Sequence, residues 1–373
     1  MTLFLTAILI VLAFAYINGF HDTGNSIATV VSTRVLAPRM AIVLAASANF
    51  IGALFGTAVA LTISTGLVDP AYVNQPVVIS ALAGAVVWNL ATWYLGLPTS
   101  SSHALFGGLC GATLAAAAGA VESGRLASAW DVILWARPGS GAGWLHREGV
   151  WYKILLPMLT SPLLGFLLGM LLMALLYAGL RSWRPVMVNR VFGRLQIVSA
   201  AYMGFSHGTN DAQKAMGLLA LALVAAQGDG TLAALPDGLD FLRHPLVSGP
   251  AGREVVAPWI QITCAVVMAA GTAAGGWRII RTMGHKMARL APVHGFAAET
   301  AAATVLATAA HFGMPVSTTQ VVSASIVGVG GARRMRSPRF TVIERILWAW
   351  LLTLPVSAAL AYAIQRVWIA LAP

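Results

Sequence analysis

The chain has 373 residues, of which 58% are hydrophobic and only 9% are charged. Soluble domains carry about 25% charged residues, so this composition excludes an ordinary soluble protein. The net charge of +11 would suggest nucleic acid in a soluble chain, but most basic residues fall in short loops between apolar runs. The chain is therefore predicted to be an all-α polytopic membrane protein with no nucleic-acid partner.

The first predicted element covers residues 3–33 and carries a polar motif inside an apolar run. It lacks a basic leader region and a small-residue cleavage site, so we expect it to remain as a membrane segment. The motif reads Gly19-Phe-His-Asp-Thr-Gly-Asn-Ser26. Asp22 falls inside the span, where a charge costs several kcal/mol unless it is paired or hydrated. We expect the helix to break at this motif, with Gly24 loosening it.

Residues 77–120 are predicted to enter the membrane and return, and their turn holds a hydroxyl cluster. The turn reads Leu97-Pro-Thr-Ser-Ser-Ser-His103. A proline at a helix start leaves the following N–H groups pointing outward, and the hydroxyls add further donors. Ser100, Ser101 and Ser102 are thus candidate ligands of an oxyanion, with ordinary capping or helix packing as the alternative.

Both motifs recur in the same order in the second half of the chain. The copies read Phe205-Ser-His-Gly-Thr-Asn-Asp-Ala-Gln-Lys214 and Met314-Pro-Val-Ser-Thr-Thr-Gln320. Asp211 follows Asp22 at a shorter separation than Pro315 follows Pro98, so the second copy holds an insertion between its motifs. Residues 227–255 can supply this insertion. Duplicated polar patches within apolar segments are typical of transporters built from internal repeats.

A glycine pair is also duplicated between the two motifs. Gly52-x-x-x-Gly56 in the first half is echoed by Gly271-x-x-x-Gly275 in the second. The hydroxyls of the second hairpin motif are Ser317, Thr318 and Thr319. Two helix N-termini of this kind facing one another would form an anion site from N–H groups and dipoles.

The loops predict the direction in which each segment crosses the membrane. Basic loops are expected on the cytoplasmic side, and the candidates are residues 34–39, 181–194, 278–289 and 333–339. Residues 63–76 and 227–254 hold most of the loop acids and are expected outside. Threading the chain through these loops puts both termini outside and makes segments 41–62 and 257–277 cross in opposite directions.

The resulting fold prediction has two inverted-topology repeats, broken helices and two re-entrant helical hairpins. Residues 1–152 form the first repeat, residues 153–194 a connecting transmembrane helix with a basic loop, and residues 195–373 the second repeat. The excursions 77–120 and 293–331 could also be full hairpins. The arm from residue 321 to 333 is, however, about 20 Å of helix, shorter than the ~30 Å hydrocarbon core. We therefore expect tips near the membrane centre.

Asp22 and Asp211 are candidate ligands for a coupling cation or carriers of a proton, and Glu299 is a third intramembrane acid. Aligning the motifs places Lys214 opposite Asn25, and Asn210 opposite His21. An ammonium group at Lys214 could take the place of a bound metal cation, or its proton could leave during transport. The plainer alternative is a permanent pair with Asp211. The candidate proton relays are His21, His103 and His207.

These segments together resemble the inorganic phosphate transporter (PiT) family, and most closely its bacterial low-affinity Pit branch. The resemblance runs from about residue 15 to residue 330 and rests on four motifs in the correct order. It implies symport of inorganic phosphate, often as a metal–phosphate complex, coupled to protons or sodium. It also implies a homodimer in the inner (plasma) membrane and no cofactor.

The resemblance assigns roles to particular residues of this sequence. Asp22, Asn25 and Asp211 match the cation site, which holds sodium in sodium-coupled members, and Glu299 matches a functionally important acid. The phosphate-contacting positions correspond to Ser100, Ser101, Ser102, Ser317, Thr318 and Thr319. Gly24 stands where alanine is usual, Gln320 replaces the expected histidine, and the chain is short for the family.

Other functions remain as alternatives. The hydroxyl clusters also fit sulfate or another tetrahedral oxyanion, and the same helix breaks could line an ion channel. An intramembrane hydrolase would use a serine of residues 98–103, yet no nucleophile-elbow pattern is present. No phosphate-binding loop for ATP is present either. The sequence therefore predicts a secondary phosphate transporter and not an enzyme.

Overall fold

The structure, a computed structural model, describes residues 1–138, 143, 147–249, 254–286, 290–332 and 340–371. Its helices are α1 (Thr2–Ser32), α2 (Pro38–Ala53), α3 (Ala58–Thr65), α4 (Gln75–Leu95), α5 (Ser101–Glu122), α6 (Leu156–Gly179), α7 (Pro185–Gly228), α8 (Pro258–Ala274), α9 (Trp277–Arg281), α10 (Pro292–His311), α11 (Thr318–Gly331) and α12 (Phe340–Leu371). The predicted basic loop at residues 333–339 lies outside the described residues, as do residues 287–289 of another.

Short turns complete the described secondary structure. They are the 3₁₀ turns η1 (Pro70–Tyr72), η2 (Ala129–Val132), η5 (Thr231–Ala234) and η6 (Asp237–Arg243), and the π-helical turns η4 (Trp151–Leu155) and η8 (Thr282–Lys286). Strands β1 (Leu246–Ser248) and β2 (Glu254–Val256) pair antiparallel with Leu246 opposite Val256. The turns η5 and η6 and this small ribbon fall almost entirely within residues 227–255, the predicted insertion.

The helices confirm a multi-pass membrane protein. Five described helical segments are long and apolar enough to cross a membrane, and two bent helix pairs raise the number to seven if each pair is one span. The single segments are Thr2–Ser32, Gln75–Leu95, Ser101–Glu122, Trp151–Gly179 and Ile343–Leu371.

Helices α1 and α7 run unbroken through the two acid motifs, so the predicted break at the first motif is wrong. Neither motif holds a proline, and its glycines serve close packing. A Cβ atom at Gly19 would overlap the backbone of Met268 in α8, and one at Gly208 would overlap the backbone of Asn49 in α2. These glycines bring neighbouring helices to the polar residues without interrupting the helix that carries them.

The helix breaks lie instead at the duplicated glycine pair. The α2–α3 pair bends by 67° and the pair formed by α8 and residues 277–284 bends by 58°. Gly56 has φ +84° and Gly275 has φ +74°. Both values lie in the left-handed region, which residues with a Cβ enter only at a cost, so glycine permits each bend.

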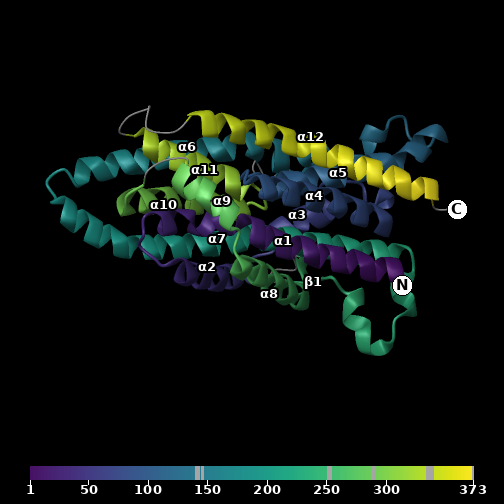
Figure 1. Cartoon of the computed structure of the whole chain (residues 1–373). Helices are drawn as coiled ribbons and strands as arrows, with labels where there is room; N and C mark the ends of the chain where they lie inside the picture. The colour runs from purple at the N-terminus through teal and green to yellow at the C-terminus, as the bar shows by residue number, and fades with distance from the viewer. Residues whose placement is uncertain (139–142, 144–146, 250–253, 287–289, 333–339, 372–373) are drawn as a thin grey trace.

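The two hairpins enter the molecule from opposite ends (Figure 1). Helices α4 and α5 lie toward the end that holds both chain termini, and α10 and α11 lie toward the end with the α6–α7 connection. The 14 residues of α11 span about 21 Å, as expected for a short arm, and the 22 residues of α5 span about 33 Å. The tips of both hairpins meet in the middle of the molecule.

The apolar core divides around this middle. One cluster of buried side chains includes residues of α1 from Phe4 to Ala15, and the other includes residues of α1 from Ile27 onward. Helix α7 likewise contributes to both clusters, on either side of residues 206–211. The polar motifs thus occupy the layer between two apolar cores. Helix α12 packs on α5 and α4, and α6 packs on α11 and α10.

Candidate functional site

The tips of the two hairpins are in direct contact. The Ser102 hydroxyl donates a hydrogen bond to the carbonyl oxygen of Val316 at 3.2 Å. Nδ1 of His103 lies 3.4 Å from Nε2 of Gln320. The structure therefore brings the two hydroxyl clusters, which are far apart in sequence, to one buried place.

Each tip ends in a capped helix N-terminus. The Ser100 side chain accepts from the N–H of His103 at 3.1 Å, and the Ser317 side chain accepts from the N–H of Gln320 at 3.3 Å. The next N–H in each helix bonds to the carbonyl of the same serine. The N–H groups of the first two helical residues, Ser101 and Ser102 or Thr318 and Thr319, have no partner within their helix. These groups and the helix dipoles favour an anion.

The two acids lie directly behind these tips. Asp22 accepts from the Ser101 hydroxyl at 2.6 Å and from the Thr319 hydroxyl at 3.2 Å. Asp211 accepts from the Thr318 hydroxyl at 2.9 Å. Ser101 and Thr318 hold the same position in their motifs, so each acid is bound by the matching hydroxyl of its own repeat.

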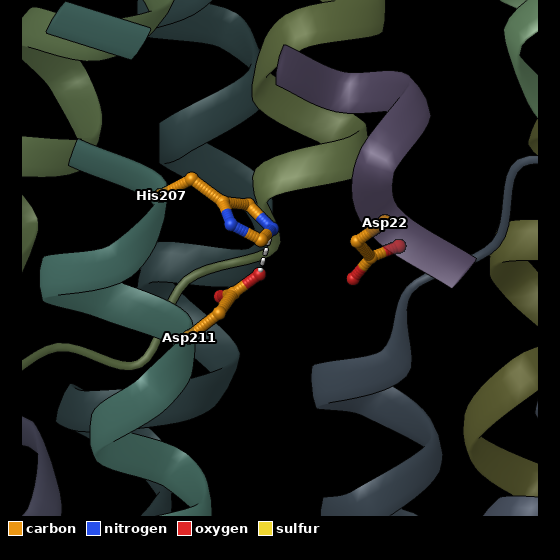
Figure 2. A group of neighbouring side chains, drawn as sticks. All are labelled: Asp22, His207 and Asp211. Carbon is orange, nitrogen blue, oxygen red and sulfur yellow. Dashed lines mark ion pairs between the residues drawn. The ribbon is translucent and has the colours of Figure 1, made fainter. Parts of the chain in front are cut away.

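Figure 2 shows Asp22 on α1 facing Asp211 and His207 on α7. Nε2 of His207 lies 2.9 Å from Oδ2 of Asp211. Ligand atoms of the three side chains all lie within 4.8 Å of one another, and all three residues are buried. Carboxylate oxygens with an imidazole nitrogen at this spacing suit a divalent cation.

Asn25 and Lys214 also contact the hydroxyls of the two tips. Nδ2 of Asn25 donates to the hydroxyls of Thr318 and Thr319 at 3.2 Å and 2.9 Å. Oδ1 of Asn25 is buried without a hydrogen-bond partner. The Lys214 ammonium donates to Asp211, to the Ser102 hydroxyl and to the Val316 carbonyl, the last at 2.9 Å.

The remaining predicted residues line the same layer. His21 pairs with Asp22 at 2.8 Å through Nδ1, and its Nε2 lies 3.5 Å from the hydroxyls of Thr92 and Thr99. Asn210 donates to the carbonyl of Met314 at 3.4 Å. With the three histidines neutral, Asp22, Asp211 and Lys214 carry one net negative charge.

Glu299 occupies a separate buried cluster. It accepts hydrogen bonds from the hydroxyls of Thr29 and Ser199 and from Nε2 of Gln196 at 3.2 Å. Thr29 lies seven residues after Asp22 in α1, so both side chains are on one face of that helix. This face links the site at the tips to the Glu299 cluster.

Sequence reasoning missed several of these partners. The spacing of Thr29 from Asp22 offered a signal, because residues seven apart share a helix face. Gln196 and Ser199 gave none, since they lie at the start of a predicted span, just after a predicted basic loop. The Val316 carbonyl is a backbone group and carries no signature in the sequence.

The chain matches the Phosphate transporter family over residues 18–361. It is 39% identical over 362 residues to a probable low-affinity inorganic phosphate transporter of Bacillus subtilis, covering 96% of this chain and 95% of that protein. Relatives described in the same words are 41% identical in Mycobacterium bovis, covering 95% of this chain and 75% of that one, and 40% identical in Rhizobium meliloti, covering 95% and 93%.

The fold is similar to that of a solved sodium-dependent phosphate transporter, with a TM-score of 0.77, 23% identity and full coverage of both chains. The family match spans most of the sequence, and the hairpin motifs and acid motifs all fall within it. Family membership favours transport over the hydrolase alternative. This chain belongs to the phosphate transporter family.

Proposed function

We propose that this chain is a symporter that imports inorganic phosphate together with a coupling cation, a proton or sodium. The observation that carries the proposal is the meeting of two helix N-termini, at Ser101 and Thr318, with Asp22 and Asp211 directly behind them. The N–H groups and hydroxyls provide an anion site, and the carboxylates provide a cation site that adjoins it.

The neighbouring carboxylates favour phosphate over sulfate as the substrate. Monohydrogen and dihydrogen phosphate can donate a hydrogen bond, whereas the sulfate dianion can only accept. The hydroxyls of Ser101 and Thr318 already contact Asp22 and Asp211, so an oxyanion bound at the tips lies within reach of these acceptors. A protonated phosphate gains a hydrogen bond there, while sulfate meets only repulsion.

Charge requires that a cation accompanies the anion. With its histidines neutral, the buried site carries one net negative charge before phosphate arrives, and burying like charges together is strongly unfavourable. A sodium ion or proton at Asp22 offsets this repulsion. The unpartnered Oδ1 of Asn25 is a ready ligand for sodium beside that carboxylate. Such mutual stabilisation couples the two fluxes.

A divalent metal is a further candidate cargo. Asp22, His207 and Asp211 present three ligand atoms at spacing that suits such an ion, next to the hairpin tips. A metal–phosphate complex would bring its own positive charge to the site, and phosphate oxygens would complete the coordination of the metal. Removal of divalent ions by a chelator would then slow phosphate uptake.

Each half of the molecule makes an equivalent set of helix contacts with the other half. These contacts support two inverted repeats whose exchange of conformations would give alternating access. Gly52 packs on the backbone of Phe205, and Gly271 packs on the backbone of Tyr16. Phe205 follows Tyr16 at the same sequence separation as Asp211 follows Asp22. In the same way, Gly111 packs on Ala358 of α12, and Gly328 packs on the backbone of Phe166 in α6. We therefore group α6 with the first half, as the counterpart of α12.

Uptake of labelled phosphate by the purified protein in liposomes tests this function. An inward sodium or proton gradient should drive phosphate above its equilibrium concentration without ATP, and excess sulfate should compete poorly. Flux that ignores the imposed gradient would identify a channel. Equal competition by sulfate would contradict the assignment of phosphate as the substrate. Addition of a chelator to parallel samples tests whether a divalent metal travels with phosphate.

A further inference from the structure

Lys214 makes the contact that Asn25 makes in the other half of the molecule. Nδ2 of Asn25 donates to the hydroxyl of Thr319, and Nζ of Lys214 donates to the hydroxyl of Ser102. Asn25 and Lys214 are equivalent in the aligned acid motifs, and Ser102 and Thr319 are equivalent in the aligned hairpin motifs. The two side chains thus occupy equivalent places, each three residues after an acid.

The oxygen atoms around Nζ of Lys214 account for all three of its N–H groups. The partners are a carboxylate oxygen of Asp211, the Ser102 hydroxyl and the Val316 carbonyl. The Ser102 hydroxyl proton is directed to the Val316 carbonyl, so its oxygen accepts from the lysine. An ammonium group has three donors and no acceptor, so none is left for phosphate. The side chain is fully buried.

This set of partners is the one expected around a hard metal cation. A carboxylate, a hydroxyl and a backbone carbonyl are the oxygen ligands that such cations take in proteins. In the other half, Asp22 meets the hydroxyls of Ser101 and Thr319 and the ring of His21, with no lysine or arginine among its described contacts. Asn25 adds a further oxygen to this half, its buried Oδ1, which has no hydrogen-bond partner. One half holds a built-in cation, and the other presents ligands for one.

We propose that Lys214 is a tethered cation that permanently fills one of two equivalent cation positions. The remaining position, at Asp22 and Asn25, is then the exchangeable one of the pair. A chain with asparagine at both positions would therefore move one more positive charge with each phosphate than this chain does. The inference rests on the proposed function, because it concerns the charge that accompanies phosphate.

The charge moved with each phosphate gives the test. The accumulation ratio of labelled phosphate in liposomes is measured against a potassium diffusion potential set with valinomycin, with sodium present. One extra charge per phosphate multiplies the ratio about tenfold for every ~60 mV, inside negative. Lys214→Asn should steepen this dependence by one charge and should bind and require one more sodium ion per phosphate than the wild type does. An unchanged slope and sodium dependence would overturn the proposal.

The reciprocal exchange provides a second variant. Asn25→Lys with Lys214→Asn moves the ammonium to the other half without changing the composition of the site. This double variant should return the slope to the wild-type value, because one position is filled again. A slope that stays at the Lys214→Asn value would contradict the proposal.

A binding measurement covers the case in which Lys214→Asn no longer transports. Lys214→Met is the matched control, since methionine offers neither a charge nor an oxygen ligand. Phosphate binding by detergent-solubilised Lys214→Asn should return at high sodium, whereas Lys214→Met should stay impaired. Equal behaviour of both variants at every sodium concentration would overturn the tethered cation. A wild type that moves no phosphate under any gradient would instead contradict the proposed function.

Discussion

Nδ1 of His103 lies 3.4 Å from Nε2 of Gln320, the residue at the same position in the second hairpin motif. A residue that contacts its own counterpart lies beside a local twofold axis. The hairpins that carry the two residues enter from opposite ends of the molecule (Figure 1). An axis of this kind at the contact supports inverted repeats, with the proposed phosphate site beside it.

The reciprocal glycine contacts predict paired effects on stability. A methyl group at Gly52 or Gly271 would overlap the backbone of Phe205 or Tyr16, so either helix must shift. We expect Gly52→Ala and Gly271→Ala each to lower the free energy of unfolding by about 1–3 kcal/mol. Thermal unfolding in detergent measures this change.

Gly119→Ala is the matched control for these two variants. Gly119 lies in α5 with nothing within 4 Å of an added Cβ, and alanine stabilises a helix interior by about 1 kcal/mol relative to glycine. Gly119→Ala should therefore unfold at the same or a higher temperature than the wild type. Equal loss of stability in all three variants would contradict the reciprocal packing.

The two acids behind the tips are expected to be essential for coupled uptake. Asp22→Asn and Asp211→Asn each replace a carboxylate with a neutral amide. The carboxylate accepts hydrogen bonds from the tips, and its charge would attract the cation. Coupled phosphate uptake should fall by at least about 10- to 100-fold, while the protein still inserts in the membrane. Asp240→Asn, at an exposed ion pair with Arg243, is the control and should transport normally. Wild-type uptake by either buried variant would refute its role.

The hydroxyls that contact the acids are expected to determine phosphate affinity. Ser101→Ala and Thr318→Val each remove a donor near the tip and leave its capping serine in place. The KM for phosphate should rise about tenfold in each variant. Thr65→Val, whose exposed hydroxyl bonds only to its own helix among the described contacts, is the control. A change in maximal rate with unchanged KM would place these hydroxyls outside the phosphate site.

Glu299 is expected to act after phosphate and the cation have bound. Its partner Thr29 lies seven residues, about two helical turns, after Asp22 in α1, so Glu299 is set apart from the proposed cation site. Glu299→Gln should keep phosphate binding but lower coupled uptake by about tenfold or more, because an amide has one oxygen and cannot accept from the Thr29 and Ser199 hydroxyls at both ends. Thr304→Ala, on the exposed face of α10, should leave both unchanged. Loss of phosphate binding in Glu299→Gln would place it in the substrate site instead.

The duplicated motifs predicted that the two hydroxyl clusters face one another, and the structure shows them in contact. Polar side chains in an apolar span were expected to be paired or hydrated, and the structure pairs Asp22 and Asp211 with hydroxyls of the tips. The same reasoning failed on helix geometry, because hydroxyls and histidines satisfy the acids without a break in α1 or α7. The breaks lie at Gly56 and Gly275, whose positive φ values depend on packing that the pattern alone does not specify.

Two features of the site could not be predicted from the duplicated motifs. The Val316 carbonyl contacts both Ser102 and Lys214, and any residue could supply a carbonyl there. The Glu299 cluster is not duplicated, since aligning the two hairpin motifs places Leu82 opposite Glu299. A comparison of the two repeats therefore could not identify the partners of Glu299, which come from two different helices.

A structure determined with phosphate and sodium present tests the central claim most directly. The account predicts phosphate density between the tips, within hydrogen-bond distance of the N–H groups of Ser101, Ser102, Thr318 or Thr319, and a cation beside Asp22. Phosphate bound elsewhere, with the two tips apart, would contradict the account.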